Sequence, residues 1–252
     1  MSLKKSAGQM YPWVTHTHSH LRGRCSHQCN YCYVQSMAKK YAARGLLTML
    51  EKYSGDIRLD YDELRVNYGS GRVIFIEHMN DLFAYLVPTD FINKILAHTY
   101  NYPENSFVFQ TKNPARAIDD IGAGFNRPLI RSDRDYFGTT IETNRNVNPH
   151  APFPSDRALA MAVIRKNYPK MKLFVTVEPV IDFDVDAMLG FMGHIKPTFI
   201  NIGADSKGNG LVEPSADKLR SFIAGVQQMG IEIRKKSNLE RILKDGKATD
   251  NG

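Results

Sequence analysis

The spacing of six short apolar segments constrains the fold more than any other feature of this chain. The segments are rich in Val, Ile, Phe and Thr, and they span residues 13–18, 72–77, 106–110, 136–141, 172–177 and 198–203. From the second segment onwards, successive starts lie 34, 30, 36 and 26 residues apart. Such intervals fit a strand, a crossover helix and two loops, whereas hairpin strands follow one another faster. Most segments are apolar nearly throughout, which predicts parallel strands covered on their faces.

Helix signals lie in the intervals between these segments. Thr89 or Asp90 can cap one helix, Asn113 precedes a proline at the start of another, and Ser215 begins a third. Another helix is expected at 34–44, and one that begins at Ser155 has Leu159 and Val163 on one face. Residues 231–234 could form a short edge strand. A last helix is expected after Ser237, which forms a capping box with Glu240.

Successive βα units with right-handed crossovers close into a barrel or open into a doubly wound sheet. Six units are fewer than a complete eight-fold barrel needs. We therefore predict an α/β fold, a partial (β/α)6 TIM-type barrel with parallel strands and a short C-terminal helix. A single domain is expected over residues 1–252, with a barrel core at 11–230, a C-terminal extension at 231–245 and a flexible tail at 246–252.

Positive charge is concentrated near the N-terminus. The chain has 33 Lys and Arg against 26 Asp and Glu, and residues 1–50 hold seven of the basic residues and no acidic one. This local excess predicts a negative partner, either a cofactor, a substrate or a polyanion. No apolar run reaches the roughly 18 residues of a membrane span, and no apolar signal segment follows the N-terminus. We expect a cytoplasmic protein with no membrane partner.

All three cysteines of the chain lie within eight residues, just after the first apolar segment. Cys25, Cys29 and Cys32 have the spacing C-x3-C-x2-C. Three thiolates on a compact loop can hold a four-iron cluster and leave one iron open to another ligand. The alternative is a zinc site with His20 or His27 as fourth ligand. Zinc loops usually come as two C-x2-C halves, however, and this sequence has no second half.

Other polar residues gather around the predicted strand ends. Because ligands bind at the carboxyl ends of parallel strands, we expect a site lined by Glu77, Asp81, Lys112, Glu142, Glu178 and Asp205. Separately, His16, His18 and His20 alternate and so share one face of an extended strand. They could bind a metal ion; the favoured interpretation is that they line the barrel interior beside the cysteines and donate hydrogen bonds.

The cysteine motif, with Tyr31 before its last cysteine and a position between a strand and a helix, resembles the radical S-adenosylmethionine superfamily. The segments FIEHMNDLFAYLVP, FVFQTKNPARAI, FGTTIETN, FVTVEPVIDFD and FINIGADSKG look similar to spore-photoproduct-lyase-like proteins and to a phage-associated branch. The likeness covers residues 11 to about 245. It implies a partial (β/α)6 barrel in which the three cysteines hold a 4Fe–4S cluster. It also implies that bound S-adenosylmethionine is cleaved reductively to a 5′-deoxyadenosyl radical, which abstracts hydrogen from a substrate.

The resemblance also assigns cofactor-binding residues by position. Tyr31 matches the aromatic residue that leans on the adenine, and Glu142 matches a polar ribose contact. Ile202 and Gly203 suit backbone contact with the adenine. The motif that contacts the cosubstrate's amino group corresponds here to Glu77, Met79, Asn80 and Asp81, without the family's usual pair of glycines.

Partners follow from the same resemblance. An enzyme of this kind takes its electron from a reductase or a flavodoxin-type donor. Likeness to a DNA-lesion lyase, together with the net charge of +7, favours a nucleic acid or nucleotide substrate. The alternative is a zinc- or cluster-stabilised nucleic-acid-binding protein without catalysis. No catalytic acid or base is assigned, because hydrogen abstraction by a radical does not require one.

Overall fold

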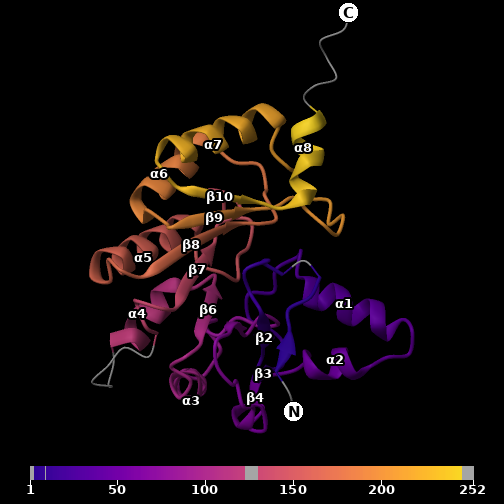
Figure 1. The fold of residues 1–252 in the computed structure, drawn as a ribbon. Helices are drawn as coiled ribbons and strands as arrows, with labels where there is room; N and C mark the ends of the chain where they lie inside the picture. Colours follow the sequence, from indigo (N-terminus) through magenta and orange to yellow (C-terminus); the bar gives the residue numbers. More distant parts are fainter. Residues whose placement is uncertain (1–2, 9, 123–129, 246–252) are drawn as a thin grey trace, which may run out of the picture.

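A computed structural model of the chain describes residues 3–8, 10–122 and 130–245. It centres on a mostly parallel sheet of eight strands in the order β1-β2-β5-β6-β7-β8-β9-β10 (Figure 1), with only β1 antiparallel to its neighbour. These strands are β1 (Lys4–Lys5), β2 (His16–His18), β5 (Val73–Ile76), β6 (Ser106–Thr111), β7 (Tyr136–Thr140), β8 (Lys172–Val177), β9 (Phe199–Ile202) and β10 (Glu232–Lys235). A separate antiparallel pair joins β3 (Leu21–Arg22) to β4 (Arg58–Leu59).

The helices divide into two groups in space (Figure 1). One group follows the parallel strands and packs along the sheet: α3 (Thr89–Tyr100), α4 (Pro114–Gly122), α5 (Pro154–Asn167), α6 (Val185–Ile195) and α7 (Ala216–Gln228). The short helices α1 (Tyr33–Ala42) and α2 (Thr48–Lys52) form a hairpin beside β3 and β4, and α8 (Glu240–Asp245) ends the described chain. Single 3-10 turns occur at Glu63–Arg65 and Ser237–Leu239. Within the described ranges, no helix has the length and apolar character required to cross a bilayer.

Alternation along the strands gives the sheet two different faces. One face packs against the helices and forms the main core, where Phe107 and Leu173 of the strands lie in the same cluster as Met161 and Phe222 of the helices. The opposite face carries a second, aromatic cluster that includes Phe75, Phe174 and Phe199, and Tyr11 and Trp13 of the N-terminal segment pack on it. We call these the helix-covered face and the aromatic face.

The expected strands are confirmed, but the sheet is larger than predicted. The edge strand expected near residues 231–234 exists as β10, and it pairs parallel with β9. The described strands run in an open order, with no pairing between β1 and β10. The tail expected at 246–252 lies outside the described residues.

Two helices differ from the sequence analysis. Helix α6 was not among the expected helices, and Gly190 and Gly193 interrupt its apolar pattern. In α5 the expected inward face is wrong, because Leu159 is 67% exposed whereas Met161 and Arg157 are buried. Packing against the sheet and the neighbouring helices therefore buries the face of α5 that holds Arg157.

A glycine on the aromatic face gives a test of this packing. A methyl group at Gly138 of β7 would lie 2.4 Å from the ring of Phe174, so Gly138→Ala should lower the free energy of unfolding by about 1–3 kcal/mol. Urea titration followed by circular dichroism measures this change in the free energy of unfolding. The matched control is Gly190→Ala in α6, where nothing lies within 4 Å of the added methyl group, and which should gain about 0.5–1 kcal/mol. Equal effects at both positions would contradict the described packing.

Candidate active site

The three cysteines lie on one loop between β3 and α1. Backbone hydrogen bonds from Gln28 N to Cys25 O (3.3 Å) and from Cys32 N to Cys29 O (3.1 Å) fold the loop into successive turns. Cys32 is the residue from which α1 begins. All three thiols are free and partly exposed.

A buried carboxylate stands beside this loop. Glu142 follows β7, and its Oε2 accepts a hydrogen bond from Arg157 of α5 at 2.8 Å. Its Oε1 accepts from the ammonium group of Lys112, which follows β6, and from the hydroxyl of Tyr31 in the cysteine loop. The Lys112 ammonium also lies 5.3 Å from the centre of the Tyr31 ring. One carboxylate therefore faces two buried cations.

Burial and nearby groups shift the pKa values of the thiols. Burial raises the pKa of Cys25 to about 12 and also raises the pKa of Cys29. Asn148 Nδ2 donates toward the sulfur of Cys29 at 3.2 Å, and burial lowers the pKa of Lys112 to about 8 although the Cys29 thiolate opposes that shift. Without a metal the buried thiols keep their protons, and a metal that binds them must displace those protons.

A second polar pair connects the cysteine loop to the loop after β5. His27 Nε2 lies 3.0 Å from Asp81 Oδ2, which also accepts the backbone N–H of Lys112 at 2.8 Å. Asn80 donates to the backbone oxygen of Gly23 at 3.1 Å. The two predicted residues Asp81 and Asn80 thus fasten the cysteine loop to the ends of β5 and β6.

Met79, the next predicted residue, contacts α1. Its sulfur lies 3.3 Å from the hydroxyl of Tyr33, and that hydroxyl also donates to the backbone oxygen of His78. Of the residues predicted to bind the cofactor, the structure therefore gathers Tyr31, Met79, Asn80, Asp81 and Glu142 around the cysteine loop.

Glu77 has a different environment. Its carboxylate accepts the backbone N–H of His20 at 2.6 Å and that of Leu21 at 3.2 Å, and it lies 2.8 Å from His20 Nδ1. The side chain is buried, and both of its oxygens are engaged. In the described chain, Glu77 thus holds the segment that leads into the cysteine loop.

Ile202 and Gly203, predicted to offer backbone contacts, lie at the end of β9. The side chain of Ile202 belongs to the helix-covered core. The backbone groups of Gly203 bond to Val177 O (3.1 Å) and Val180 N (2.8 Å), and a methyl group here would lie 2.8 Å from the Glu178 carboxyl group. Glu178 in turn pairs with Lys236 at 2.8 Å.

Asp205, the last of the six polar strand ends, organises its own loop. Its carboxylate accepts the backbone N–H of Asn209 at 2.5 Å and that of Lys207 at 3.0 Å. Of the six polar strand ends, Asp81, Lys112 and Glu142 therefore lie around the cysteine loop, whereas the other three bond to other parts of the chain.

Two of the three histidines make hydrogen bonds, as expected, since His18 lies 3.3 Å from Glu63 O and His20 lies 2.8 Å from Glu77 Oε1. His16 and His18 pair with Ile74 and Ile76, which belong to the helix-covered core. His20 lies beyond the strand, where its Nε2 is 2.9 Å from the Tyr68 hydroxyl. The histidines therefore point away from the aromatic face, because β2 presents Thr17 there opposite Phe75.

The donor set fits a cluster held by three thiolates. Within the described ranges, no group of three or more His, Cys, Asp or Glu residues converges to hold a single metal ion. The hydroxyl of Ser26, inside the motif, is buried and has no hydrogen-bond partner among the described residues.

Three residues of this site were not predicted to act there. Arg157 lies in the first turn of α5, where the sequence pattern alone does not indicate burial. Asn148 lies in a loop whose Asn-Pro signal indicates only a turn. His27 was considered as a zinc ligand, and its bond to Asp81 depends on a loop 54 residues away. No local signal in the sequence would have identified the first two.

The pairing of Glu142 can be tested without any cofactor. Glu142→Gln leaves Lys112 and Arg157 without their shared counter-charge in a buried site, so the free energy of unfolding should fall by about 3–5 kcal/mol. Urea titration measures the loss. Asp217→Asn is the matched control, because it removes an equivalent pair, Asp217–Arg220, whose acid is 92% exposed. A Glu142→Gln protein as stable as that control would refute the buried pairing.

Comparison with solved structures shows the fold. A spore photoproduct lyase complexed with dinucleoside spore photoproduct aligns with a TM-score of 0.60 and 13% sequence identity, over 92% of this chain and 78% of that one. A variant of the lyase with bound AdoMet and dinucleoside spore photoproduct gives 0.59 and 11% over the same shares. No curated protein matches in sequence. A family model described as "Protein of unknown function (DUF5131)" matches residues 10–187. That range is more than half of the chain, and the protein therefore belongs to the DUF5131 family.

Proposed function

We propose that this protein is a radical S-adenosylmethionine enzyme. The observation that carries the proposal is the placement of three free cysteines on one loop beside the buried Lys112, Glu142 and Arg157. The sheet supports it through its likeness to spore photoproduct lyase. We propose further that the parallel strands form a partial (β/α)6 barrel, and that residues 1–252 are one domain.

The 4Fe–4S cluster would be held by the thiolates of Cys25, Cys29 and Cys32. When bound, the cluster and S-adenosylmethionine would supply a 5′-deoxyadenosyl radical that abstracts hydrogen from the substrate. The protein's own residues then have three tasks, which are to hold the thiolates, to orient the cosubstrate and to exclude water.

Charge suggests how the cosubstrate is oriented. Lys112 and Arg157 are buried cations that share the Glu142 carboxylate, and a cation beside the cysteines can attract an anionic group. The carboxylate of S-adenosylmethionine supplies such a group, and Lys112 is the nearer of the two cations to the cysteines, since it interacts with Cys29. Tyr31, held by Glu142, offers an aromatic face in the same place.

The proposed substrate is a nucleic acid or nucleotide. Seven basic and no acidic residues in the first 50 give the cysteine-bearing part of the chain a positive field. The solved lyase structures carry a dinucleoside photoproduct, which supports the same class of substrate here. Affinity for DNA should therefore fall steeply as salt rises.

The central experiment measures iron and cosubstrate cleavage together. Anaerobic reconstitution with iron and sulfide should give a brown protein with about four irons per chain, and added dithionite and S-adenosylmethionine should release 5′-deoxyadenosine. Cys29→Ala should abolish the release, because it removes one of the three ligands.

Ser26→Ala is the matched control, since it changes the same loop without removing a thiol. It should keep the iron content of the unaltered protein. Stoichiometric zinc without any release of 5′-deoxyadenosine would replace the proposal with a metal-stabilised nucleic-acid-binding protein.

A further inference from the structure

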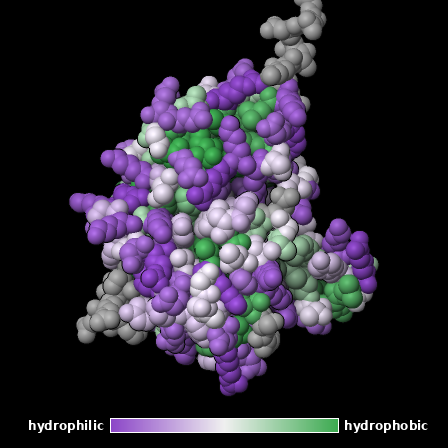
Figure 2. All heavy atoms as spheres, viewed as in Figure 1, coloured by the Kyte–Doolittle hydropathy of each residue, from purple (hydrophilic) through white to green (hydrophobic). Residues whose placement is uncertain are grey.

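The α1–α2 hairpin exposes large apolar side chains. Tyr41 is 38% exposed, Leu46 59%, Leu47 50% and Leu50 37%. Figure 2 shows hydrophobic side chains gathered on the projection that Figure 1 labels α1 and α2. We call these four residues the hairpin patch. Contiguous exposed apolar surface rimmed by polar residues is typical of interaction sites.

The rim of the hairpin patch is cationic. Lys39, Lys40, Arg44 and Lys52 are exposed around it. Between residues 33 and 53 the only acidic residue is Glu51. A partner that covers the apolar centre must therefore present acidic groups at the edge of its own interface.

Two hollows border the hairpin patch. A cleft of about 710 Å³ runs between the hairpin and β2, and Tyr41, Leu46 and Met49 line it. A hollow of about 440 Å³ adjoins it and shares Arg22 and Lys52. Such depressions can accept side chains of a docked protein.

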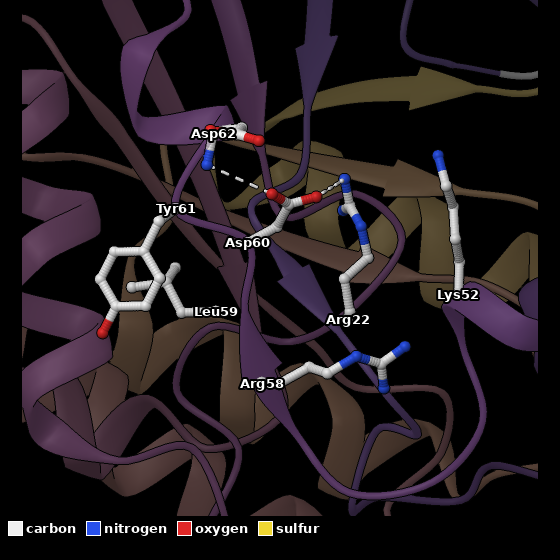
Figure 3. Close-up of a pocket in the computed structure, with 7 residues that line it drawn as sticks. All are labelled: Arg22, Lys52, Arg58, Leu59, Asp60, Tyr61 and Asp62. Carbon is white, nitrogen blue, oxygen red and sulfur yellow. Dashed lines mark hydrogen bonds and ion pairs between the residues drawn. The ribbon is translucent and has the colours of Figure 1, made fainter.

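Two arginines of the smaller hollow are engaged within the protein, and Figure 3 shows this for one of them, Arg22. Arg22 points toward Asp60, with the two groups 3.0 Å apart. Arg58 donates to the backbone oxygens of Glu51 and Ser54 at 3.0 and 3.2 Å. Arg22 and Arg58 therefore build the hollow, while the charge offered to a partner comes from the exposed rim.

The hairpin is directly connected to the cysteine loop. Helix α1 starts at Tyr33, immediately after Cys32, and its ten residues span about 15 Å. All three cysteines belong to the motif, so the chain has no cysteines for a second cluster that could relay electrons. If the proposed function holds, a partner docked beside this loop can deliver the electron.

We propose that the hairpin patch and its cationic rim form the docking surface for an acidic electron-donor protein of the flavodoxin type. This inference rests on the proposed function. The reduced flavin of the partner gives up one electron and the cluster gains it, with no proton or group transferred. Apolar contact at the four patch residues and attraction at the rim hold the two proteins together.

The test uses the reconstituted protein and reduced flavodoxin as the probe. Two variants are compared with the unaltered protein, L46S/L47S for the apolar centre and K39E/K40E/R44E for the rim. Each should weaken flavodoxin binding, measured by titration calorimetry, by about tenfold or more. The rim variant should also lose most of the salt dependence of binding.

Controls separate docking from folding and from the proposed function. L159S removes an equally exposed leucine, and K166E/K170E reverses exposed charges on and just beyond α5; both should bind flavodoxin normally. Dithionite is a small reductant that needs no docking surface, so it should bleach the cluster at the same rate in all proteins. Absence of a cluster or of dithionite-driven 5′-deoxyadenosine would defeat the proposed function instead.

Several outcomes would overturn the docking surface. One is that flavodoxin binds and reduces both hairpin variants as fast as the unaltered protein. Another is that the unaltered protein forms a dimer that L46S/L47S abolishes, as light scattering would show. A third is that it sediments with phosphatidylserine vesicles through the same residues while flavodoxin does not bind.

Discussion

One buried carboxylate ties together four separate parts of the chain. Glu142, at the end of β7, accepts hydrogen bonds from Tyr31 in the cysteine loop, from Lys112 at the end of β6 and from Arg157 in α5. Burying the charge of Glu142, Lys112 or Arg157 without a partner would cost much of the free energy of folding. The carboxylate therefore determines how the cysteine loop, the strand ends and α5 sit relative to one another, and the arrangement of the candidate site depends on it.

A second carboxylate positions the chain before the cysteine loop. Glu77, at the end of β5, accepts the backbone N–H groups of His20 and Leu21, which would otherwise be unpaired in a buried turn. Asp81 and Asn80 then hold the loop itself through His27 and Gly23. The loop after β5 thus has a structural task that complements any contact with a cosubstrate.

The proposed chemistry and the proposed docking surface meet at Cys32. On one side of this residue lie the buried Lys112 and Glu142, and the Lys112 ammonium is the group that we propose faces an anionic cosubstrate. On the other side α1 leads to an exposed apolar patch with a cationic rim. Under the two proposals, the reaction would take place in a buried environment and the electron would be delivered at the surface.

The sequence by itself determined the βα order, the parallel strands and the cysteine loop, because these depend on local periodicity and spacing. It also placed Asp81, Lys112 and Glu142 near one another, since the carboxyl ends of parallel strands share an edge. It did not distinguish Glu77 and Asp205 from them, because every polar residue after a strand looks alike until its hydrogen-bond partners are known. The inward face of α5 was likewise misjudged: burial of Arg157 is favourable only because Glu142, 15 residues earlier, comes into contact with it. The sequence predicted where the strands end, and only the tertiary structure decided which of their polar residues meet, because burying a charge requires a partner that local sequence does not specify.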